Sequence, residues 1–363
     1  MKTDAQTRRR TDAQGRTGAP AHSTADSVRL RGGAPVPASP WVVLDERQRG
    51  AQFIELPIKS VLNSPRQTGM DFWSLNPYVG CEFGCSYCYA RYAHRYVVER
   101  GSAKGTLGPA AWDDETFERQ IFVKVAAPEI AALAARPSRL GGHTIVIGTA
   151  TDPYQPAERT YRITRRVLER LAQVHGLHIG IITKSPLIAR DLDVLQRLAE
   201  RSRVTVLISL ISVDALLVRK LEVRSPVPAV RLGALEKLVR AGLHAGVLIA
   251  PVLPGITDDV PHLEAVMRAA KDAGAAFARA DPLRLYPPIK RRFLGVVEQE
   301  FPALLAKYER AFDARGFVTR EYATALKRRV ARLQRKVGFV HDEYADALAH
   351  RPAEDVVQWE MPL

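Results

Sequence analysis

Residues 76–91 read NPYVGCEFGCSYCYAR and hold all three cysteines of the 363-residue chain. Cys81, Cys85 and Cys88 follow a C-x3-C-x2-C spacing at the end of an apolar stretch that predicts a strand over 73–80. A secreted scaffold would instead spread an even number of cysteines along its length for disulfide pairing. The three thiols are therefore predicted to converge on one inorganic centre.

Two kinds of centre suit three clustered thiolates. Thiolates select zinc or iron–sulfur clusters, and a tetrahedral zinc site needs a fourth ligand, for which His94 is the only nearby candidate. A four-iron, four-sulfur cubane held by the three cysteines would keep its fourth iron open and reactive. Gly80 and Gly84 favour a loop that wraps closely around a centre. Three buried free thiols, packed as small apolar residues, are the remaining reading.

Beyond the cysteines, short apolar runs alternate with segments of helical period. Amphipathic stretches at 159–175 and 229–242 predict helices, and Ser185 before Pro186 predicts another helix start. This alternation indicates an α/β fold with parallel strands, either a doubly wound sheet or a whole or partial barrel, with ligands at the C-terminal strand ends. Besides 73–80, the predicted strands are 143–149, 178–183, 203–209, 244–251 and 277–284.

The two ends of the chain differ from this middle part. Residues 1–45, rich in Arg, Thr, Gly, Ala and Pro, predict a disordered basic tail, and 291–363 predict helices without a convincing strand. With 46% apolar and 25% charged residues, the chain can bury a core in one large domain or two. We find no secretion signal and no apolar run long enough to span a membrane, so a cytoplasmic protein without membrane contact is expected.

The charge balance suggests a partner. The chain has 53 Lys and Arg against 39 Asp and Glu, a formal charge of +14, which fits a polyanionic partner or simply a basic proteome. Residues 326–337 predict a helix with an apolar stripe on one face and a cationic face opposite. That face is either the solvated side of a docked helix or a nucleic-acid contact. Its cations are Arg328, Arg329, Arg332, Arg335 and Lys336.

The cysteine spacing, with Tyr87 directly before the third cysteine, resembles the signature of the radical S-adenosylmethionine (radical SAM) enzymes. Further segments resemble the spore photoproduct lyase-like branch of uncharacterised bacterial proteins within that superfamily. These segments are GTATDPYQPAE at 148–158, TKSPLIARDLDVL at 183–195 and APVLPGITD at 250–258.

The resemblance implies an α/β fold with a partial (β/α)6 TIM-like barrel over 46–290, followed by a C-terminal helical extension. It implies that Cys81, Cys85 and Cys88 hold a [4Fe-4S] cluster whose unique iron binds S-adenosylmethionine. One-electron reduction would then cleave the cofactor to methionine and a 5'-deoxyadenosyl radical that abstracts hydrogen from an unknown substrate. An external one-electron reductant of the flavodoxin or ferredoxin type is also implied.

The resemblance further places cofactor-binding residues at the strand ends. Asp152 would accept from the cofactor's ammonium, Ser209 would contact its ribose, and Tyr87 would pack near its adenine. Lys184 closes the third strand, where it suits a carboxylate as a point charge. Turn, capping and core roles are the structural alternatives. The full implied set is Tyr87, Thr149, Thr151, Asp152, Lys184, Ser209 and Arg224.

The chain departs from the family pattern in two places. It reads LEVR at 221–224 where related proteins read Leu-Glu-Pro-Arg, so this loop is expected to be less rigid. Spore photoproduct lyases use an additional cysteine to return hydrogen to the product, whereas all three cysteines here are committed to the cluster. Repair by that route is not expected unless Tyr78, Tyr89 or Tyr154 donates the hydrogen. The alternative function is a non-enzymatic zinc- or Fe-S-containing nucleic-acid-binding module, and a simple electron carrier is disfavoured.

Overall fold

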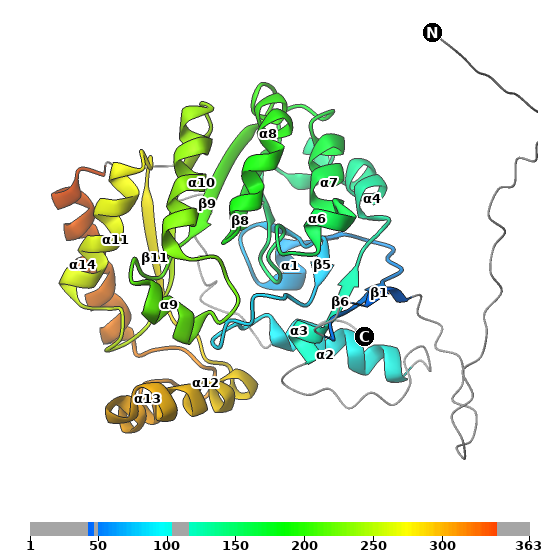
Figure 1. Cartoon of the computed structure of the whole chain (residues 1–363). Helices are drawn as coiled ribbons and strands as arrows, with labels where there is room; N and C mark the ends of the chain where they lie inside the picture. Colours follow the sequence, from blue (N-terminus) through cyan, green and yellow to red (C-terminus); the bar gives the residue numbers. More distant parts are fainter. Residues whose placement is uncertain (1–42, 47–49, 104–115, 340–363) are drawn as a thin grey trace, which may run out of the picture. The chain divides into compact units, whose positions relative to one another are not determined.

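The computed structural model describes residues 43–46, 50–103 and 116–339 (Figure 1). The predicted tail over 1–45 lies outside this part, except for its last positions, which belong to strand β1 (Val43–Glu46). Residues 340–363 of the predicted C-terminal helical region also lie outside it. Within the described ranges, no helix is both long and apolar enough to cross a membrane.

Six parallel strands form the main sheet, and strands adjacent in space follow one another along the chain. β3 (Leu62–Asn63) is added antiparallel at the β4 edge, and β11 forms the other edge. A doubly wound sheet reverses its strand order at a switch point, whereas this order runs on without reversal. The structure thus confirms the implied open, partial (β/α)6 barrel. Its parallel strands are β4 (Trp73–Leu75), β7 (Ile145–Ile147), β8 (His178–Thr183), β9 (Arg203–Ser209), β10 (His244–Val252) and β11 (Ala278–Pro282).

Five of the six strand predictions match these strands to within two residues at either end. The prediction of one strand over 73–80 is wrong, because the chain leaves the main sheet after β4. Pro77 has no N–H to donate to a sheet ladder. Beyond it, β5 (Tyr78–Val79) pairs antiparallel with β6 (Gln120–Val123) in a second sheet of order β1-β2-β6-β5, which also contains β2 (Gln52–Glu55).

Helices α7, α8, α10, α11 and α14 line the outer side of the main sheet (Figure 1). The predicted helix over 159–175 is split, because Arg162 adopts left-handed backbone with φ 50° between α6 (Glu158–Tyr161) and α7 (Ile163–Leu171). The Ser185 hydroxyl caps as predicted, accepting from the Leu187 N–H, but the chain first forms the 3-10 helix η1 (Pro186–Asp191) before α8 (Leu192–Ala199). The other three covering helices are longer: α10 (Pro228–Arg240), α11 (Val260–Asp272) and α14 (Arg320–Val337).

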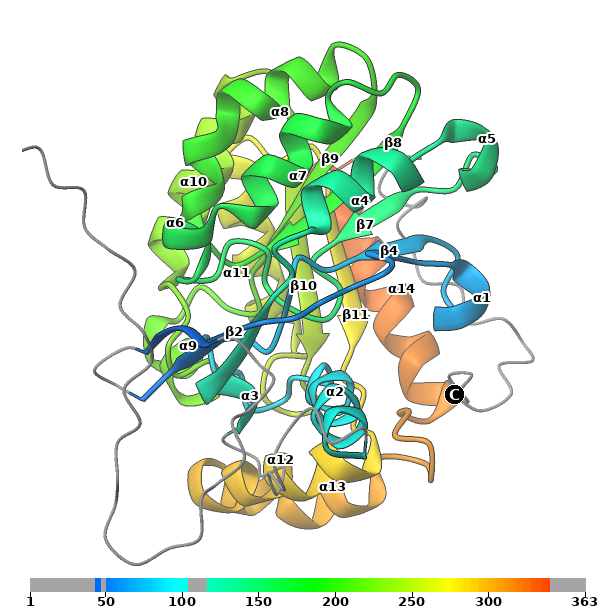
Figure 2. The same ribbon diagram turned by 90° about the vertical axis from the view of Figure 1, so that its right-hand side faces the viewer.

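The remaining helices are short or lie around the C-terminal ends of the strands. In Figure 2 the arrow of β10 points toward α12 and α13, so these two helices lie beyond that end of the sheet. The remaining bounds are α1 (Pro65–Thr68), α2 (Arg91–Ala103), α3 (Thr116–Arg119), α4 (Ala127–Ala134), α5 (Pro137–Leu140), α9 (Ala215–Leu221), α12 (Pro287–Glu300), η2 (Pro302–Leu304) and α13 (Leu305–Arg310).

Helix α14 (Arg320–Val337) contains the predicted apolar stripe, and it packs against α11 and β11. Leu326, Val330 and Leu333 are buried there. Two of the five predicted cations fasten the helix: Arg329 donates to the Asp258 carbonyl, and Lys336 pairs with Glu264 at 2.7 Å. The other three cations, Arg328, Arg332 and Arg335, are exposed.

Candidate active site

The three cysteines lie on a loop that leaves β5 through Gly80. Gly80 has φ 90°, and a Cβ at this position would lie 2.7 Å from the Gln120 carbonyl oxygen, so only glycine fits. The Cys81 N–H donates to the Phe117 carbonyl at 3.1 Å. Cys81 and Cys85 are buried and Cys88 is half-buried, and all three are free thiols.

Two side chains from the loop after β7 brace the start of this cysteine loop. The Thr151 hydroxyl donates to the Gly80 carbonyl at 2.6 Å, and Gln155 Nε2 donates to the same oxygen at 3.1 Å. Gln155 Oε1 also accepts from the Glu82 N–H at 3.0 Å. Thr151, an implied cofactor contact, therefore holds the loop backbone. The sequence did not single out Gln155, although it lies in the same polar segment four residues further on.

The far side of the cysteine loop is hydrogen-bonded to the segment after α9. Cys85 forms an isolated antiparallel bridge with Glu222. The Ser86 N–H donates to the Leu221 carbonyl at 2.9 Å, and the Arg224 N–H donates to the Phe83 carbonyl at 3.1 Å. Backbone pairing thus fixes the segment where a proline was expected.

Two arginines flank this segment. The Arg219 guanidinium donates to the Val223 carbonyl, so the loop that was expected to be less rigid has an additional fastening. Arg224 is exposed, and its guanidinium lies beside Gly84, where an added Cβ would come within 3.2 Å of Nη2. Arg224 therefore lies along the cysteine loop at the surface.

Glu222 is the centre of a buried charge network at the ends of β8 and β9. It forms an ion pair with Arg231, accepts from the Tyr87 hydroxyl, and lies 3.8 Å from Lys184 Nζ. Arg231 also donates to the Ser209 carbonyl at 2.9 Å. Burial alone would raise the pKa of Glu222, but Arg231 and Lys184 hold it below its usual value. Tyr87 thus bonds directly to the Glu222 carboxylate, and the Ser209 carbonyl is linked to it through Arg231.

Lys184 projects from the end of β8 near the thiols. Burial acts to lower its pKa, but Cys85 and Glu222 favour the charged form, and the pKa is raised. Its ion pair with Glu222 is long, at 3.8 Å. The ammonium is therefore charged and only loosely paired.

Asp152 is held rigidly at the neighbouring strand end. Its oxygens accept from the Thr183 hydroxyl at 2.6 Å, the Lys184 N–H at 2.7 Å and the Tyr154 N–H at 2.9 Å. Burial raises its pKa. The bond from Tyr154 makes Asp152 a turn residue, as the structural alternative held. A carboxylate accepts about four hydrogen bonds, so one more donor can still be bound.

Thr149 faces β4. Its hydroxyl lies 2.6 Å from the Ser74 hydroxyl and accepts from Asn76 Nδ2 at 3.0 Å, while Asn76 Oδ1 accepts from the Ala150 N–H at 2.8 Å. The Tyr89 hydroxyl donates to the Thr149 carbonyl. Thr149 thus fixes the loop after β7, together with Asn76, which sequence reasoning missed despite its place at a strand end.

The three tyrosines considered as hydrogen donors lie in different environments. Tyr78 and Tyr154 are fully buried, and the Tyr78 hydroxyl donates to Glu158. Tyr89 is 36% exposed and directly follows Cys88. Tyr89 is therefore the member of this trio that reaches the surface next to the cysteine loop.

His94 does not join the thiols. Its Nε2 lies 2.8 Å from the Gln120 carbonyl oxygen, and its ring packs against Phe117 and Phe122. Burial lowers its pKa to about 4. Among the described residues, no group of three His, Cys, Asp or Glu side chains, the three cysteines included, is placed to hold a single metal ion. His94 is therefore not placed to act as the fourth ligand of a zinc site.

The donor set does fit an iron–sulfur cluster. The thiols are soft ligands on one loop, which Gly80 and Gly84 allow to turn tightly. Burial raises the pKa of all three thiols, to about 12 for Cys85, while Lys184 acts to lower the pKa of Cys85 and Cys88. A cation beside buried thiols favours their ligand form, the thiolate.

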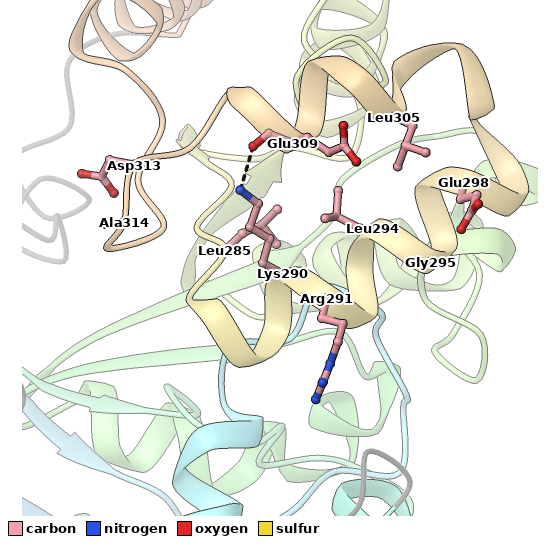
Figure 3. A pocket seen from close by; sticks show the side chains of 10 residues that line it. All are labelled: Leu285, Lys290, Arg291, Leu294, Gly295, Glu298, Leu305, Glu309, Asp313 and Ala314. Atoms are coloured by element: carbon pink, nitrogen blue, oxygen red, sulfur yellow. Dashed lines mark hydrogen bonds between the residues drawn. The ribbon is translucent and has the colours of Figure 1, made fainter.

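A separate cavity lies between α12 and α13 (Figure 3). Its volume is about 620 Å³, and Lys290 Nζ donates to the Glu309 carbonyl at 2.8 Å across it. Its lining includes Leu285, Arg291, Leu294 and Glu298 but none of the implied site residues. This cavity is therefore distinct from the cysteine site.

Comparisons with known proteins agree with this geometry. The family model described as the radical SAM superfamily matches residues 75–266. An uncharacterised protein of Mycobacterium tuberculosis (strain H37Rv) is 31% identical over 78% of this chain and 80% of its own. An uncharacterised protein of Methanocaldococcus jannaschii is 25% identical over 57% of this chain and 70% of its own.

Solved structures share the fold. Spore photoproduct lyase complexed with dinucleoside spore photoproduct superposes with a TM-score of 0.56 at 16% identity, over 79% of each chain. A double mutant of that lyase with bound AdoMet and the same dinucleoside gives a TM-score of 0.54, also over 79% of each chain. With the cysteine loop at the strand ends and a family match over more than half of its length, this chain belongs to the radical SAM superfamily.

Proposed function

We propose that this protein is a radical SAM enzyme in which Cys81, Cys85 and Cys88 hold a [4Fe-4S] cluster. The observation that carries the proposal is the placement of three thiols on one braced loop, facing the charged ends of β7 and β8. Superfamily membership and the partial-barrel fold support radical SAM catalysis. A cluster with three protein ligands keeps one iron open for S-adenosylmethionine.

When bound, the cluster and cofactor supply reductive cleavage of the sulfonium and a 5'-deoxyadenosyl radical. In this proposal Asp152 accepts from the cofactor's ammonium, because its carboxylate is already oriented by three donors. Lys184 binds the cofactor's carboxylate as a point charge, because its own ion pair is long. Thr149 and Thr151 hold the intervening loop in place.

The remaining implied residues act at the edge of the site. Ser209 contacts the ribose, and Tyr87 lies on the adenine side with its hydroxyl anchored on Glu222. Arg224 binds an anionic group at the surface. Apolar side chains that pack with the cysteines, among them Phe83, Leu253 and Phe293, exclude water from the site.

Nucleic acid is the substrate class that the surface charge favours. Arg328, Arg332 and Arg335 lie on the exposed face of α14, while the opposite face packs on α11 and β11. Arginines on one helix face bind phosphates without reading sequence, so this contact would supply affinity and leave specificity to the site.

Anaerobic reconstitution with iron and sulfide tests the proposal. We expect a brown protein with about four irons per chain. With dithionite and S-adenosylmethionine, it should yield 5'-deoxyadenosine. The Cys85→Ser variant should lose iron and product but keep its circular dichroism spectrum. A colourless protein that retains one zinc and forms no 5'-deoxyadenosine would refute the proposal. Deuterium transfer from candidate substrates into 5'-deoxyadenosine would then identify the substrate.

A further inference from the structure

We propose that the outer face of the α9 segment, formed by Leu216 on the helix with Val213 just before it and Val223 just beyond it, is the docking surface for an acidic one-electron carrier protein. The inference deepens the proposed function and rests on it, because such a carrier has a role here only if the cysteine loop holds a redox centre. Docking would bring the carrier against the outside of that loop.

Helix α9 is apolar on two sides. Val218 and Leu221 on its inner side are buried in the same cluster as Cys81 and Cys85. Leu216 on the helix is 78% exposed, and the residues that flank the helix, Val213 and Val223, are 38% and 52% exposed. A surface helix normally presents polar residues to solvent, and exposed apolar groups that lie together mark interaction sites. The outer face therefore fits a protein partner.

The position of this face suits electron delivery. The residues that follow α9 pair directly with the cysteine loop: Glu222 bridges Cys85, and the Arg224 N–H donates to the Phe83 carbonyl. A protein docked on α9 would be separated from the thiols by this one short helix, and a helix with its side chains is about 10–12 Å across. The reaction moves one electron from the reduced carrier to the oxidised centre, with no bond made or broken and no proton transferred.

The charge around the face selects an acidic partner. Arg219 and Arg224 are exposed beside the apolar residues, against one exposed acid, Asp214, while Lys220 is 47% exposed and pairs with Glu300 at 2.8 Å. The whole chain carries +14, so two copies of it would repel each other. Opposite charge on a partner raises its association rate and fixes its orientation.

The test measures carrier binding as well as turnover. The reconstituted holoenzyme is titrated into a fluorescently labelled flavodoxin, and separately into a [2Fe-2S] ferredoxin, with anisotropy recorded at low and high salt. For whichever probe binds, the Leu216→Glu variant should weaken binding at least tenfold. Leu216 lies in the first turn of α9, where an added carboxylate is compatible with the helix. The matched control is Leu133→Glu, since Leu133 is 69% exposed on α4, away from α9 in both Figure 1 and Figure 2.

A second readout separates docking from chemistry. Bleaching of the iron–sulfur absorbance by reduced flavodoxin should slow in Leu216→Glu and in Val223→Glu, whereas dithionite should reduce both variants as fast as the wild type. Unchanged carrier binding in both variants overturns the inference, as does binding of neither probe to the wild type. A change of oligomeric state in Leu216→Glu with unchanged carrier binding assigns the face to self-association and also overturns it. If dithionite yields no 5'-deoxyadenosine from the wild type, the proposed function fails instead.

Discussion

Two buried charge networks in this molecule differ in how completely they are paired. In the outer network, Arg190 lies 3.0 Å from Glu158 and 2.7 Å from Asp191, and Arg165 lies 3.0 Å from Asp191. In the network at the strand ends, Glu222 pairs closely with Arg231, but Lys184 remains 3.8 Å from its nearest carboxylate oxygen. The outer network is closed, whereas the one beside the cysteines ends in a loosely held ammonium.

The difference follows from the chemistry of the two cations. A guanidinium donates in a fixed fork and can satisfy two carboxylates at once, so Arg190 joins α6 to η1. An ammonium is a compact charge on a flexible stem, which can turn from one anion to another. We interpret the closed network as holding the fold together, and we propose that the open one receives a ligand.

Removing Arg190 should have the largest effect on stability. Arg190→Gln leaves Glu158 and Asp191 buried with a missing partner, which costs about 3–5 kcal/mol. Urea unfolding of the cofactor-free protein measures this loss. Arg197→Gln serves as the control, because Arg197 is 59% exposed in a 3.8 Å pair and should change stability by about 1 kcal/mol or less. Equal losses in the two variants would contradict the structural role of the closed network.

Removing Lys184 should change binding more than stability. Lys184→Gln should weaken S-adenosylmethionine binding about 10–100-fold, because a hydrogen bond between charged groups contributes about 1.5–3 kcal/mol. Folding should lose less than in Arg190→Gln, because Glu222 keeps its close ion pair with Arg231 and the pair with Lys184 is long, at 3.8 Å. Calorimetric titration of the reconstituted protein measures the affinity, with Lys271→Gln on α11 as the control. A stability loss as large as that of Arg190→Gln would remove the distinction between the two networks.

Acid should weaken the region around the cysteine loop through His94. Burial lowers the pKa of His94 to about 4 from 6.5, so the unfolded chain binds the extra proton between these values. Stability is therefore full above pH 6.5 and falls by about 3 kcal/mol as the pH drops to 4. The free energy of unfolding, measured from pH 4 to 7, should depend less steeply on pH in the His94→Gln variant. An unchanged slope would show that His94 is not the group responsible.

The smallest effect is expected at the surface. The triple variant Arg328→Gln, Arg332→Gln and Arg335→Gln removes three exposed cations of α14. The plot of log binding constant against log salt concentration should become less steep by about 3, since each phosphate contact contributes about one to the slope. Stability should stay within about 0.5 kcal/mol, since these groups are not the ones that fasten α14. Anisotropy with a labelled oligonucleotide at several salt concentrations measures the slope. Binding that ignores both salt and the triple substitution would end the nucleic-acid proposal.

The main sheet was predictable because its strands are unusually clear in the sequence. β8 and β9 were predicted to the residue, since each is a short, mostly aliphatic run bounded by polar residues. The second sheet was not, because its strands have only two to four residues and gain their stability from distant partners. The left-handed backbone at Arg162 was also missed, as a non-glycine residue gives no local signal for it.

The site shows the same division. The cysteine spacing predicted that the three thiols share one loop, and the strand pattern placed Lys184 at the end of β8, where its N–H donates to Asp152. Their roles toward a cluster and cofactor stay predictions. The bracing by Asn76 and Gln155 could not be predicted, because each acts on residues more than 70 positions away in the chain. Whether a threonine hydroxyl such as that of Thr151 holds a loop or contacts a ligand likewise depends on contacts that only the folded structure shows.

The clamp between the cysteine loop and the segment after α9 sets an order of maturation. Tyr87 and its partner Glu222 are 135 residues apart. At roughly 5–20 residues per second, synthesis of that interval takes about 7–27 s. During this time the nascent cysteine loop lacks its contacts with residues 221–224, so its thiols are more open to oxidation. In the proposed enzyme, iron loading that yields a protected centre would follow synthesis of α9 and Glu222, and a chain truncated before α9 would lack this clamp on the cysteine loop.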